Sequence, residues 1–364
     1  MDAPRTVGVE EEMLLVDPET RTTTARAAEV LRKEHERGDG LDKELFRHQI
    51  ETRTEPETSL DSIEKQLVAW RREAAEVAGE VGLAVMASGT APIGGEPQVT
   101  DDDRYRDMVD YFGETARTGT TCGCHVHVAI ESAEEGVGVI DRIVPWLPVL
   151  LAISANSPYW AARDTGYASW RSQAWTRWPS AGATEAFGSV ERYAETSRML
   201  QMTGAARDDG MLYYDARLST KQPTVEVRVL DVCADVEDAV LAAALVRGLV
   251  ETAADDWAAD KPHEPWRAEI LRACSWRAGR WGLADKLVHP LQRELAPARE
   301  VLSALVDHVR PSLETAGELD RVRDGVERVL RGGGATRQRA AFERGGSVEG
   351  VVDDLIARTQ EQPT

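Results

Sequence analysis

Two stretches of the sequence carry charged side chains at alternate positions. One residue separates Glu10 from Glu12, and one residue separates Glu226 from Arg228. Period-two spacing is typical of a β-strand, whose successive side chains point to opposite faces. A charged group held beside an apolar core needs a partner or a ligand. The pattern therefore predicts the floor of a polar binding site, and an exposed ion pair between Glu226 and Arg228 is the alternative.

A third stretch contains the pattern Cys-x-Cys-His-x-His. It is formed by Cys122, Cys124, His125 and His127. These residue types are common zinc ligands. On an extended strand, however, the cysteines and the histidines point to opposite faces, so they cannot close one tetrahedral site together. We therefore expect His125 and His127 to act as a pair beside an anionic ligand or a harder metal.

A fourth stretch is rich in carboxylates. Glu51 and Glu55 share one face whether the segment is extended or helical. Neighbouring carboxylates repel each other, and burial raises their pKa unless a cation compensates. Mg²⁺ is such a cation, because it prefers oxygen ligands and is often bound by one or two carboxylates and substrate phosphates. A solvated run of charges is the alternative for this stretch.

Residues 163–178 are rich in arginine and tryptophan. Mixed aromatic and basic side chains can bind nucleic acid. Because the chain as a whole is acidic, we instead expect a lid that presents Arg171 to a carboxylate or phosphate. The glycine-rich segment 331–339 lacks the Gly-Lys-Ser/Thr ending of a phosphate-binding loop, and we expect it to be a loop between helices.

The elements that must position these residues fall into two parts. We expect one catalytic domain over residues 1–364, with a sheet-rich active-site part at about 5–235 and a helical part at about 236–364. The three valines of segment 224–231 are expected to share an apolar face. The predicted helices cover residues 25–37, 63–81, 137–155, 236–257, 264–283, 293–309 and 317–331, and the predicted strands cover 6–16, 83–88, 122–129 and 224–231.

Composition limits the partners. The chain has 63 acidic and 43 basic residues and a formal net charge of −20, which argues against nucleic acid or an anionic membrane as the main partner. Its 4 cysteines form no disulfide framework and its first residues form no signal peptide, so we expect a cytoplasmic protein. The apolar run 143–153 contains prolines and is too short to span a membrane.

The order of these stretches resembles the glutamate–cysteine ligase type 2 family, a group of carboxylate–amine ligases related in fold to glutamine synthetase. Residues 8–12, 125–127 and 224–228 carry most of the resemblance. The further matches are short, but they occur in family order and extend into the C-terminal helices. They are Asp103-Arg104-Tyr105, Ser157-Pro158-Tyr159, Tyr214-Asp215-Ala216-Arg217, Arg280-Trp281-Gly282-Leu283 and Gly345-Gly346-Ser347.

The resemblance implies a fold and a reaction. The fold is α+β, with a curved antiparallel β-sheet that forms the active site and helices packed outside it. The reaction joins the carboxylate of glutamate, or of a similar amino acid, to an amine such as cysteine. ATP phosphorylates the carboxylate, and the amine then attacks the acyl phosphate, which releases ADP and phosphate. Metal ions and arginines neutralise the charge of the transferred phosphoryl group.

The resemblance also implies roles for the residues above. ATP and Mg²⁺, or Mn²⁺, are the implied cofactors. Catalytic roles fall to Glu226, Arg228 and Arg171, and the arginines contact phosphate or the substrate carboxylate. Nucleotide-binding roles fall to Arg228, His125 and His127. The implied metal ligands are Glu10, Glu12, Glu51, Glu55, His125, His127 and Glu226.

One position departs from the family pattern. Many relatives have Gly-Thr-His-Pro where this chain has Gly89-Thr90-Ala91-Pro92, so any role of that histidine is absent here. No motif selects the acceptor, and cysteine follows only from the family name. Two other functions stay open: a metal-dependent hydrolase that uses the histidine and glutamate clusters on a metal-bound water, and a non-catalytic ligand-binding protein. We expect small-molecule substrates and a homo-oligomer, with a dimer as the commonest form.

Overall fold

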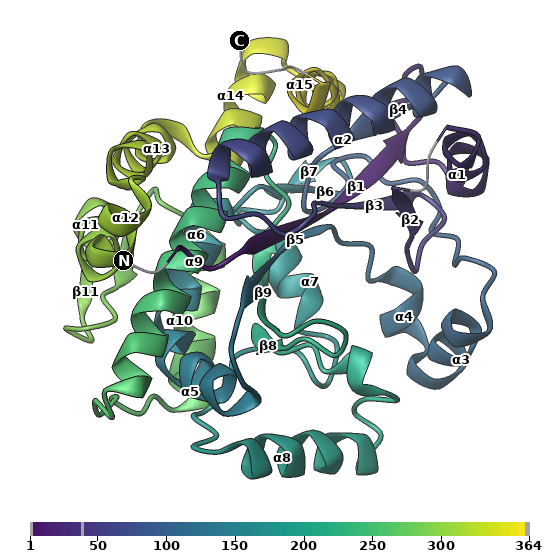
Figure 1. The fold of residues 1–364 in the computed structure, drawn as a ribbon. Coiled ribbons are helices and arrows are strands. Elements are labelled where there is room, and N and C mark those ends of the chain that lie inside the picture. The colour runs from purple at the N-terminus through teal and green to yellow at the C-terminus, as the bar shows by residue number, and fades with distance from the viewer. Residues whose placement is uncertain (1–2, 38–39, 361–364) are drawn as a thin grey trace.

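The protein is built on one antiparallel β-sheet. The computed structural model describes residues 3–37 and 40–360. Within them, the strands follow the order β2-β3-β1-β5-β9-β8, and β4 also pairs with β1. The sheet is not closed, and two small hairpins, β6–β7 and β10–β11, lie outside it (Figure 1). The strands are β1 (Val7–Val16), β2 (Leu41–Lys43), β3 (Gln49–Arg53), β4 (Ala84–Met86), β5 (Gly123–Ala129), β6 (Tyr159–Trp160), β7 (Arg163–Asp164), β8 (Ala216–Leu218), β9 (Thr224–Asp231), β10 (Lys286–Val288) and β11 (Leu295–Pro297).

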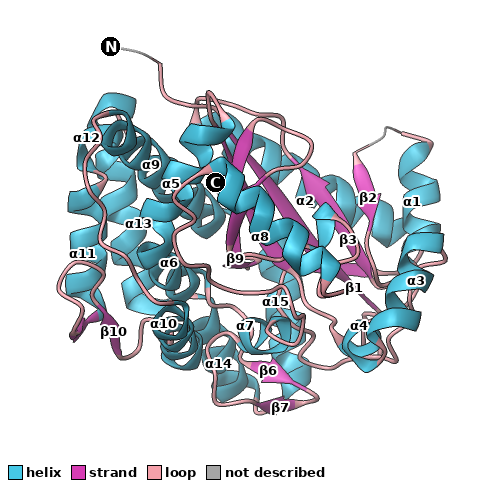
Figure 2. Cartoon of the chain, turned by 90° about the horizontal axis from the view of Figure 1, so that it is seen from below, coloured by secondary structure: helices cyan, strands magenta, loops and turns pink. Residues whose placement is uncertain are grey.

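Helices surround the sheet and form most of the chain beyond β9 (Figure 2). Helices α5, α6 and α9 pack against the central strands β5 and β9, and α2 packs against β1 and β3. The class is therefore α+β, as expected. The helices are α1 (Ala27–His35), α2 (Leu60–Glu80), α3 (Asp103–Phe112), α4 (Glu114–Thr118), α5 (Ala133–Ile143), α6 (Leu147–Ser154), α7 (Trp170–Trp175), α8 (Val190–Met202), α9 (Val236–Ala258), α10 (Ala268–Trp281), α11 (Ala298–His308), α12 (Arg310–Ala316), α13 (Leu319–Gly332), α14 (Gly334–Gly345) and α15 (Val348–Gln360), with 3₁₀ turns η1 (Val144–Trp146) and η2 (Asp209–Met211).

One face of the sheet is apolar because its central strands alternate. Val9 of β1, Val126 of β5 and Val227 of β9 are each at most 1% exposed and belong to one core cluster with helix α9. β-Branched side chains suit a pleated surface that packs against helices. The opposite face of the same strands carries the charged residues, so the core fixes the strands while the other face is left for chemistry.

The pairing of β5 with β9 contains a β-bulge. Val126 pairs with Val227, but Cys124 pairs with Leu230, so two residues of β9 oppose one residue of β5. A shift of one residue exchanges the faces of the side chains beyond it. All three valines of this strand, Val225, Val227 and Val229, nevertheless belong to one buried apolar cluster. Fully buried Leu230 belongs to the same cluster, and Val229 also lines a cavity beside the strand.

Most predicted helices are present with shifted ends. The predicted helix 137–155 is two helices, because η1 contains Pro145 and proline removes a backbone donor. Its apolar stretch Ala133–Ser154 is long enough to cross a membrane by length and composition, but 89% of its most apolar window is buried inside the protein. The expectation of a loop at 331–339 is wrong, since only Gly333, with extended backbone, separates α13 from α14.

A buried ion pair interrupts the apolar face of β1. Glu11 is fully buried, and its carboxylate accepts hydrogen bonds from Arg71 Nε at 2.8 Å and Nη2 at 2.6 Å. Arg71 belongs to α2 and also donates to the carbonyl oxygens of Cys233 and Ala234, both at 2.7 Å. The guanidinium therefore ties β1, α2 and the segment before α9 together. The alternating pattern gave no sign of this pair.

Glu11→Gln should destabilise the fold strongly. It leaves the Arg71 guanidinium buried without a counter-charge, and breaking a buried pair in this way costs about 3–5 kcal/mol of unfolding free energy. Urea unfolding followed by circular dichroism measures the loss. Arg321→Gln is the control, because that guanidinium pairs with Asp61 and Glu64 near the surface, where ion pairs contribute little. Equal losses in the two variants would contradict the role given to the buried pair.

Candidate active site

Antiparallel register brings most of the predicted site residues into one row across the polar face of the sheet. Residues that pair on neighbouring strands have side chains within contact distance on the same face. The row therefore joins residues that are more than two hundred positions apart in the chain. From β3 to β8, its pairs are Glu51–Glu12, Glu10–His125, His127–Glu226 and Glu226–Arg217.

Glu10, His127 and Glu226 form the first group that could hold a metal ion. One ligand atom from each lies within 4.8 Å of the others. Glu10 Oε1 lies 3.5 Å from His127 Nε2, and Glu10 Oε2 lies 3.3 Å from His125 Nδ1. Burial raises the pKa of Glu10, but the neighbouring His125 and His127 outweigh burial, and the pKa lies below its usual value. Glu10 is therefore ionised at neutral pH, as a metal ligand must be.

Glu12, Glu44 and Glu51 form the second group. Burial and the charge of Glu44 raise the pKa of Glu12 to about 7. Burial, Glu44 and Glu10 together raise the pKa of Glu51 well above its usual value. The three carboxylates therefore repel one another, and a proton or a cation must relieve the repulsion. Glu44 follows β2, and no pattern in the sequence pointed to it.

Two imidazole nitrogens fit a cation on this face. The Nε2 atoms of His125 and His127 are buried and have no hydrogen-bond partner among the described residues. His127 Nδ1 lies 3.0 Å from Thr224 Oγ1, and His125 Nε2 lies 3.8 Å from Glu12 Oε1. Burial and the charge of Arg228 lower the pKa of His125 to about 4, so its imidazole is neutral and can act as a ligand. Carboxylate oxygens suit Mg²⁺ or Mn²⁺, whereas imidazole nitrogens favour transition metals, so the carboxylates carry the fit to Mg²⁺.

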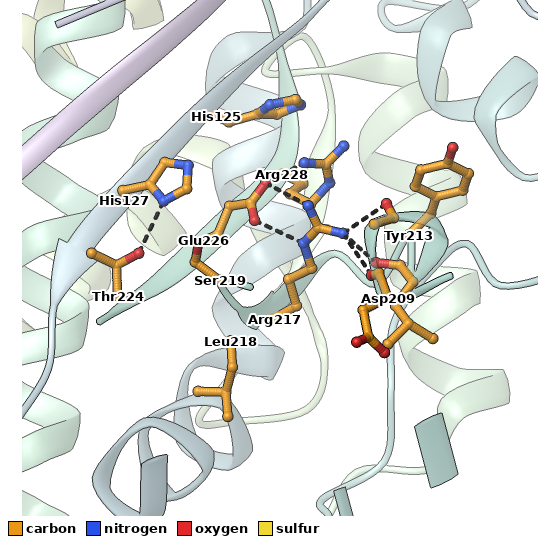
Figure 3. A network of polar contacts seen from close by, with 12 residues as sticks. His125, His127, Asp209, Tyr213, Arg217, Leu218, Ser219, Thr224, Glu226 and Arg228 are labelled. Carbon is orange, nitrogen blue, oxygen red and sulfur yellow. Dashed lines mark hydrogen bonds and ion pairs between the residues drawn. The ribbon is translucent and has the colours of Figure 1, made fainter. Parts of the chain in front are cut away.

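Glu226 is held between two arginines (Figure 3). Arg217 of β8 donates from Nε to Glu226 Oε2 at 2.7 Å and from Nη2 to Oε1 at 3.2 Å, and Arg228 donates to Oε1. Glu226 is 2% exposed and Arg228 is 9% exposed, so the alternative of an exposed ion pair is wrong. Burial raises the pKa of Glu226, but the charges of Arg228 and Arg217 outweigh burial and hold the pKa below its usual value.

Arg217 is a site residue that the sequence alone did not assign. Its Nη1 donates to the carbonyl oxygens of Gly210 at 3.0 Å and Leu212 at 3.1 Å, so the segment around η2 fixes the guanidinium. Arg217 lies in a family motif, but that motif gave it no partner. The antiparallel pairing of β8 with β9 supplies the partner, because it sets Arg217 directly opposite Glu226.

Arg171 is buried beneath the site, and the expectation that a lid presents it is wrong. Its side chain is 2% exposed and donates from Nη2 to the carbonyl oxygen of Arg228 at 3.2 Å. Its Nη1 lies 4.0 Å from the carboxylate of Asp231. Asp231 in turn accepts hydrogen bonds from Ser157 Oγ at 2.6 Å and Ser169 Oγ at 2.8 Å. A network of buried polar groups therefore fixes Arg171 against β9.

Other predicted residues lie apart from the row. Glu55 is exposed in the loop after β3 and belongs to neither group of candidate ligands found in the described residues. Cys122 and Cys124 are fully buried in apolar clusters, and burial raises the pKa of both thiols. Cys124 pairs with Glu11, whereas His125 pairs with Glu10. The cysteine and the histidine therefore face opposite sides of β5, as expected.

The family follows from a comparison with known proteins. The model of glutamate–cysteine ligase family 2 matches residues 6–358. The chain belongs to this family. Membership places it among the carboxylate–amine ligases, and it confirms the resemblance that the ordered motifs indicated.

Curated relatives match this ligase over nearly its whole length. A protein of Nocardioides sp. named as a candidate glutamate–cysteine ligase 2-1 is 59% identical, and the match covers 98% of this chain and 96% of the relative. A protein of Streptomyces avermitilis with the same name is 47% identical, and the match covers 98% of this chain and 99% of the relative.

Solved structures share the fold of the ligase at low sequence identity. A glutamate–cysteine ligase from Francisella tularensis, solved in complex with AMP, matches with a TM-score of 0.71 at 14% identity over 100% of this chain and 91% of its own. A bifunctional glutathione synthetase from Pasteurella multocida matches with a TM-score of 0.74 at 16% identity over 98% of this chain and 52% of its own.

A glutamate-to-glutamine substitution should change the stability of the metal-free protein in opposite directions in the two clusters of candidate metal ligands. Glu51→Gln removes a repelling charge, so the metal-free protein should melt at the same temperature or higher. Glu226→Gln leaves Arg217 and Arg228 without their shared counter-charge and should cost about 3–5 kcal/mol. Both variants should lose part of the stabilisation that Mg²⁺ or Mn²⁺ gives the wild type.

Thermal unfolding with and without metal measures both effects. A metal-free Glu51→Gln protein that melts well below the wild type would contradict repulsion in the second group. An unchanged metal-induced shift in Glu226→Gln would remove this residue from the ligand set.

Proposed function

We propose that the protein is an ATP-dependent ligase that joins the carboxylate of glutamate, or of a similar amino acid, to an amine through an acyl phosphate. The products are an amide, ADP and phosphate. The observation that carries the proposal is the row of carboxylates and imidazoles set beside buried arginines. The names of the relatives support glutamate, and the AMP bound to the Francisella enzyme supports a nucleotide site on this fold.

The two clusters of candidate metal ligands would hold divalent cations. Glu10, His127 and Glu226 offer mixed ligands, and the second group offers carboxylates alone. Mg²⁺ or Mn²⁺ bound there would supply positive charge that neutralises the phosphates. The raised pKa of Glu51 supports this use, because a cation relieves the repulsion that burial makes costly.

The buried arginines would stabilise the charge that develops on the transferred group. The Nε atoms of Arg228 and Arg171 are buried and have no hydrogen-bond partner in the described part of the chain. The charge of Glu226 raises the pKa of Arg228 despite burial, so the guanidinium stays positive. Phosphoryl transfer depends mainly on positioning and charge neutralisation, and fixed cationic donors provide both. Glu226 would position Arg228 as well as contact metal.

A metal-dependent hydrolase would need only the carboxylates and histidines to activate a water molecule. It would not require two buried guanidiniums beside them with donors left unpaired. Cationic donors of this kind are typical of sites that bind phosphate or carboxylate. The arginines therefore favour the ligase over the hydrolase.

The ligase reaction is tested by incubating the protein with ATP, Mg²⁺, glutamate and pooled amines. We expect mass spectrometry to find ADP and a condensed product, and omission of the amines should remove the product. AMP in place of ADP would point to adenylation and contradict the acyl phosphate. Hydrolysis without nucleotide would favour the hydrolase, and bound but unchanged ATP would favour a non-catalytic protein.

The cellular location and the oligomeric state are further predictions for this protein. The negative net charge and the absence of a disulfide framework favour the cytoplasm. A homo-oligomer, with a dimer as the first expectation, follows from its general frequency among soluble enzymes. Size-exclusion chromatography with light scattering decides the oligomeric state.

Gly123→Ala should slow the reaction and also lower the stability of the fold, because the Arg171 guanidinium that it displaces is held by buried hydrogen bonds. A methyl group at Gly123 would collide with the guanidinium of Arg171 and lie 3.1 Å from His125 Nε2. Displacing a catalytic group by about 1 Å can slow turnover about a hundredfold. Gly79→Ala in α2 is the matched control, because its methyl group meets nothing within 4 Å. ADP release measures both rates, and equal rates would contradict the placement of Arg171 beside the reacting groups.

A further inference from the structure

A cavity of about 420 Å³ lies beside Arg228 at the end of β9. Side chains of α6, α7 and α10 and the loop 181–183 complete its wall. Its volume is that of a small-molecule site. Arg228 connects it to the metal-binding row, because the same guanidinium pairs with Glu226. None of the candidate metal ligands lines the cavity, so it is a separate compartment next to the row.

Three polar groups in the wall of this cavity have unmet hydrogen-bonding capacity. Arg171 Nε, Arg228 Nε and Ser275 Oγ are buried without a hydrogen-bond partner within residues 3–37 and 40–360. Arg171 is 2% exposed and Arg228 is 9% exposed. Buried polar atoms are nearly always paired, so atoms of this kind indicate a ligand or an ordered water.

The wall also contains the carboxylate of Asp215. Its backbone is fixed, since its N–H donates to the Gly182 carbonyl at 3.0 Å and its carbonyl accepts from the Arg228 N–H at 2.8 Å. No hydrogen bond or ion pair within 4.0 Å engages its carboxylate in the part of the chain that the structure describes. Burial raises the pKa of Asp215 to about 6, although the charge of Arg171 opposes the rise. The group therefore carries a negative charge at neutral pH and is available to a cation.

The rest of the wall is mainly apolar. Trp276 Nε1 donates to the hydroxyl of Tyr167 at 3.2 Å, and the ring of Trp175 lies 4.9 Å from that of Tyr213. These contacts hold the two indoles in place. Aromatic walls favour bulky apolar ligands, because each ring buries a large area. The remaining apolar lining comes from Leu151, Ala181, Ala183, Val229 and Ala273.

We propose that this cavity binds the acceptor amine, and that the acceptor is a primary amine on an aromatic or other bulky apolar body. Asp215 binds the ammonium group, and Trp175 and Trp276 pack against the body. The inference rests on the proposed ligase function and identifies the second substrate of the same site.

The wall carries three guanidiniums, those of Arg171, Arg228 and Arg272, and two carboxylates, those of Asp215 and Glu269. Arg228 pairs with Glu226, and Arg171 donates to a backbone carbonyl of β9. The Asp215 carboxylate has no such partner among the described residues, so it offers an ammonium group a free counter-charge.

An acidic amino acid would place a second negative charge near Asp215, and like charges repel. An ammonium group would instead form a charge-assisted hydrogen bond with that carboxylate. Cysteine is small and would leave much of the apolar volume unfilled. Arg228 stands between the cavity and the metal-binding row, where it can contact the activated carboxylate that the amine attacks.

The first test compares acceptors in the presence of ATP, Mg²⁺ and glutamate. We expect kcat/KM for 2-phenylethylamine to exceed that for ethylamine and for L-cysteine by about tenfold or more, because additional apolar groups are buried. L-Phenylalanine shows whether the acceptor also carries a carboxylate. A preference for cysteine or ethylamine over both aromatic amines would overturn the proposal.

Asp215→Asn tests the ammonium contact while keeping the shape of the side chain. Loss of a hydrogen bond between charged groups should raise KM for 2-phenylethylamine by about tenfold or more. Hydroxylamine is small and largely uncharged at neutral pH. Its nitrogen attacks the carbonyl carbon of the acyl phosphate and forms a C–N bond. The bond between that carbon and the oxygen shared with phosphorus breaks, and phosphate leaves with a proton from nitrogen.

In Asp215→Asn, the rate of hydroxamate formation should therefore fall at least about tenfold less than the rate with 2-phenylethylamine. Asp110→Asn, at an exposed carboxylate on α3, is the matched control and should alter neither rate. Equal slowing of both nucleophiles by Asp215→Asn would mean a structural role for Asp215 and would overturn the proposal.

Ala273→Trp tests the cavity without touching its buried charges. Ala273 is exposed on α10, so a large side chain there can fill the cavity without entering the core. Isothermal titration calorimetry of 2-phenylethylamine, with and without ADP and Mg²⁺, measures binding apart from turnover. We expect binding to the wild type that falls about tenfold or more in the variant, in line with the cost of losing apolar contact.

The outcomes separate this inference from the ligase function. If the wild type forms no hydroxamate, the ligase function fails, and calorimetry still decides what the cavity binds. If hydroxamate forms but the wild type binds no aromatic amine, or neither variant weakens that binding, the cavity assignment fails alone.

Discussion

Repulsion between carboxylates held on a rigid sheet is the constraint on which the site depends. Neighbouring strands lie about 5 Å apart, so groups fixed on them by pairing cannot move away from one another. Glu10 lies beside two histidines, and two arginines offset the charge of Glu226. Glu51 faces Glu44, Glu12 and Glu10, all of which raise its pKa. These neighbours in the described part of the chain include no cationic side chain, so a proton or a metal ion must neutralise the charge of Glu51.

Buried arginines provide the internal supports of this fold. Arg71, Arg171 and Arg247 are its largest fully buried side chains. Each bonds to backbone carbonyl groups: Arg71 to the segment after β9, Arg171 to β9 itself, and Arg247 to Thr58 at 2.6 Å. A guanidinium has five donors in a fixed planar arrangement, so one side chain can join several segments at once. Arg171 thus fixes the strand that carries Glu226, and Arg71 fixes the segment that follows it.

The sequence predicts the strands β1, β4, β5 and β9 and most side chains of the polar row, because alternation determines which side chains share a face. It does not predict the short strands β2 and β8, and it leaves the segment of β3 open between strand and helix. It does not predict partners that depend on pairing between distant strands. Arg217 gains its role only through the register of β8 with β9, and Glu44 comes from a loop without periodicity. Glu11 lies between Glu10 and Glu12 in the sequence, but on the strand its side chain points to the opposite face, into the core. There the buried Arg71 neutralises its charge.

Two further predictions fail because tertiary packing overrides the local sequence pattern. Glycines in 331–339 indicate a loop, but a single extended residue suffices to turn one helix into the next. The arginine and tryptophan content of 163–178 indicates an exposed lid. Buried Asp231 instead draws Arg171 inward, since a carboxylate held by two serines provides a partner that no local pattern reveals.

The β-bulge in β9 limits how this site can change through evolution. Beyond it, Asp231 reaches the polar side, where Asn156 N donates to it at 2.9 Å, while Leu230 enters the core. A substitution in β9 alters one side chain, whereas loss of one residue would exchange the faces of all side chains beyond the deletion. The position of every side chain beyond the bulge therefore depends on the number of residues before it. Relatives can diverge here by replacement, but a single insertion or deletion would turn Asp231 into the core and release Arg171.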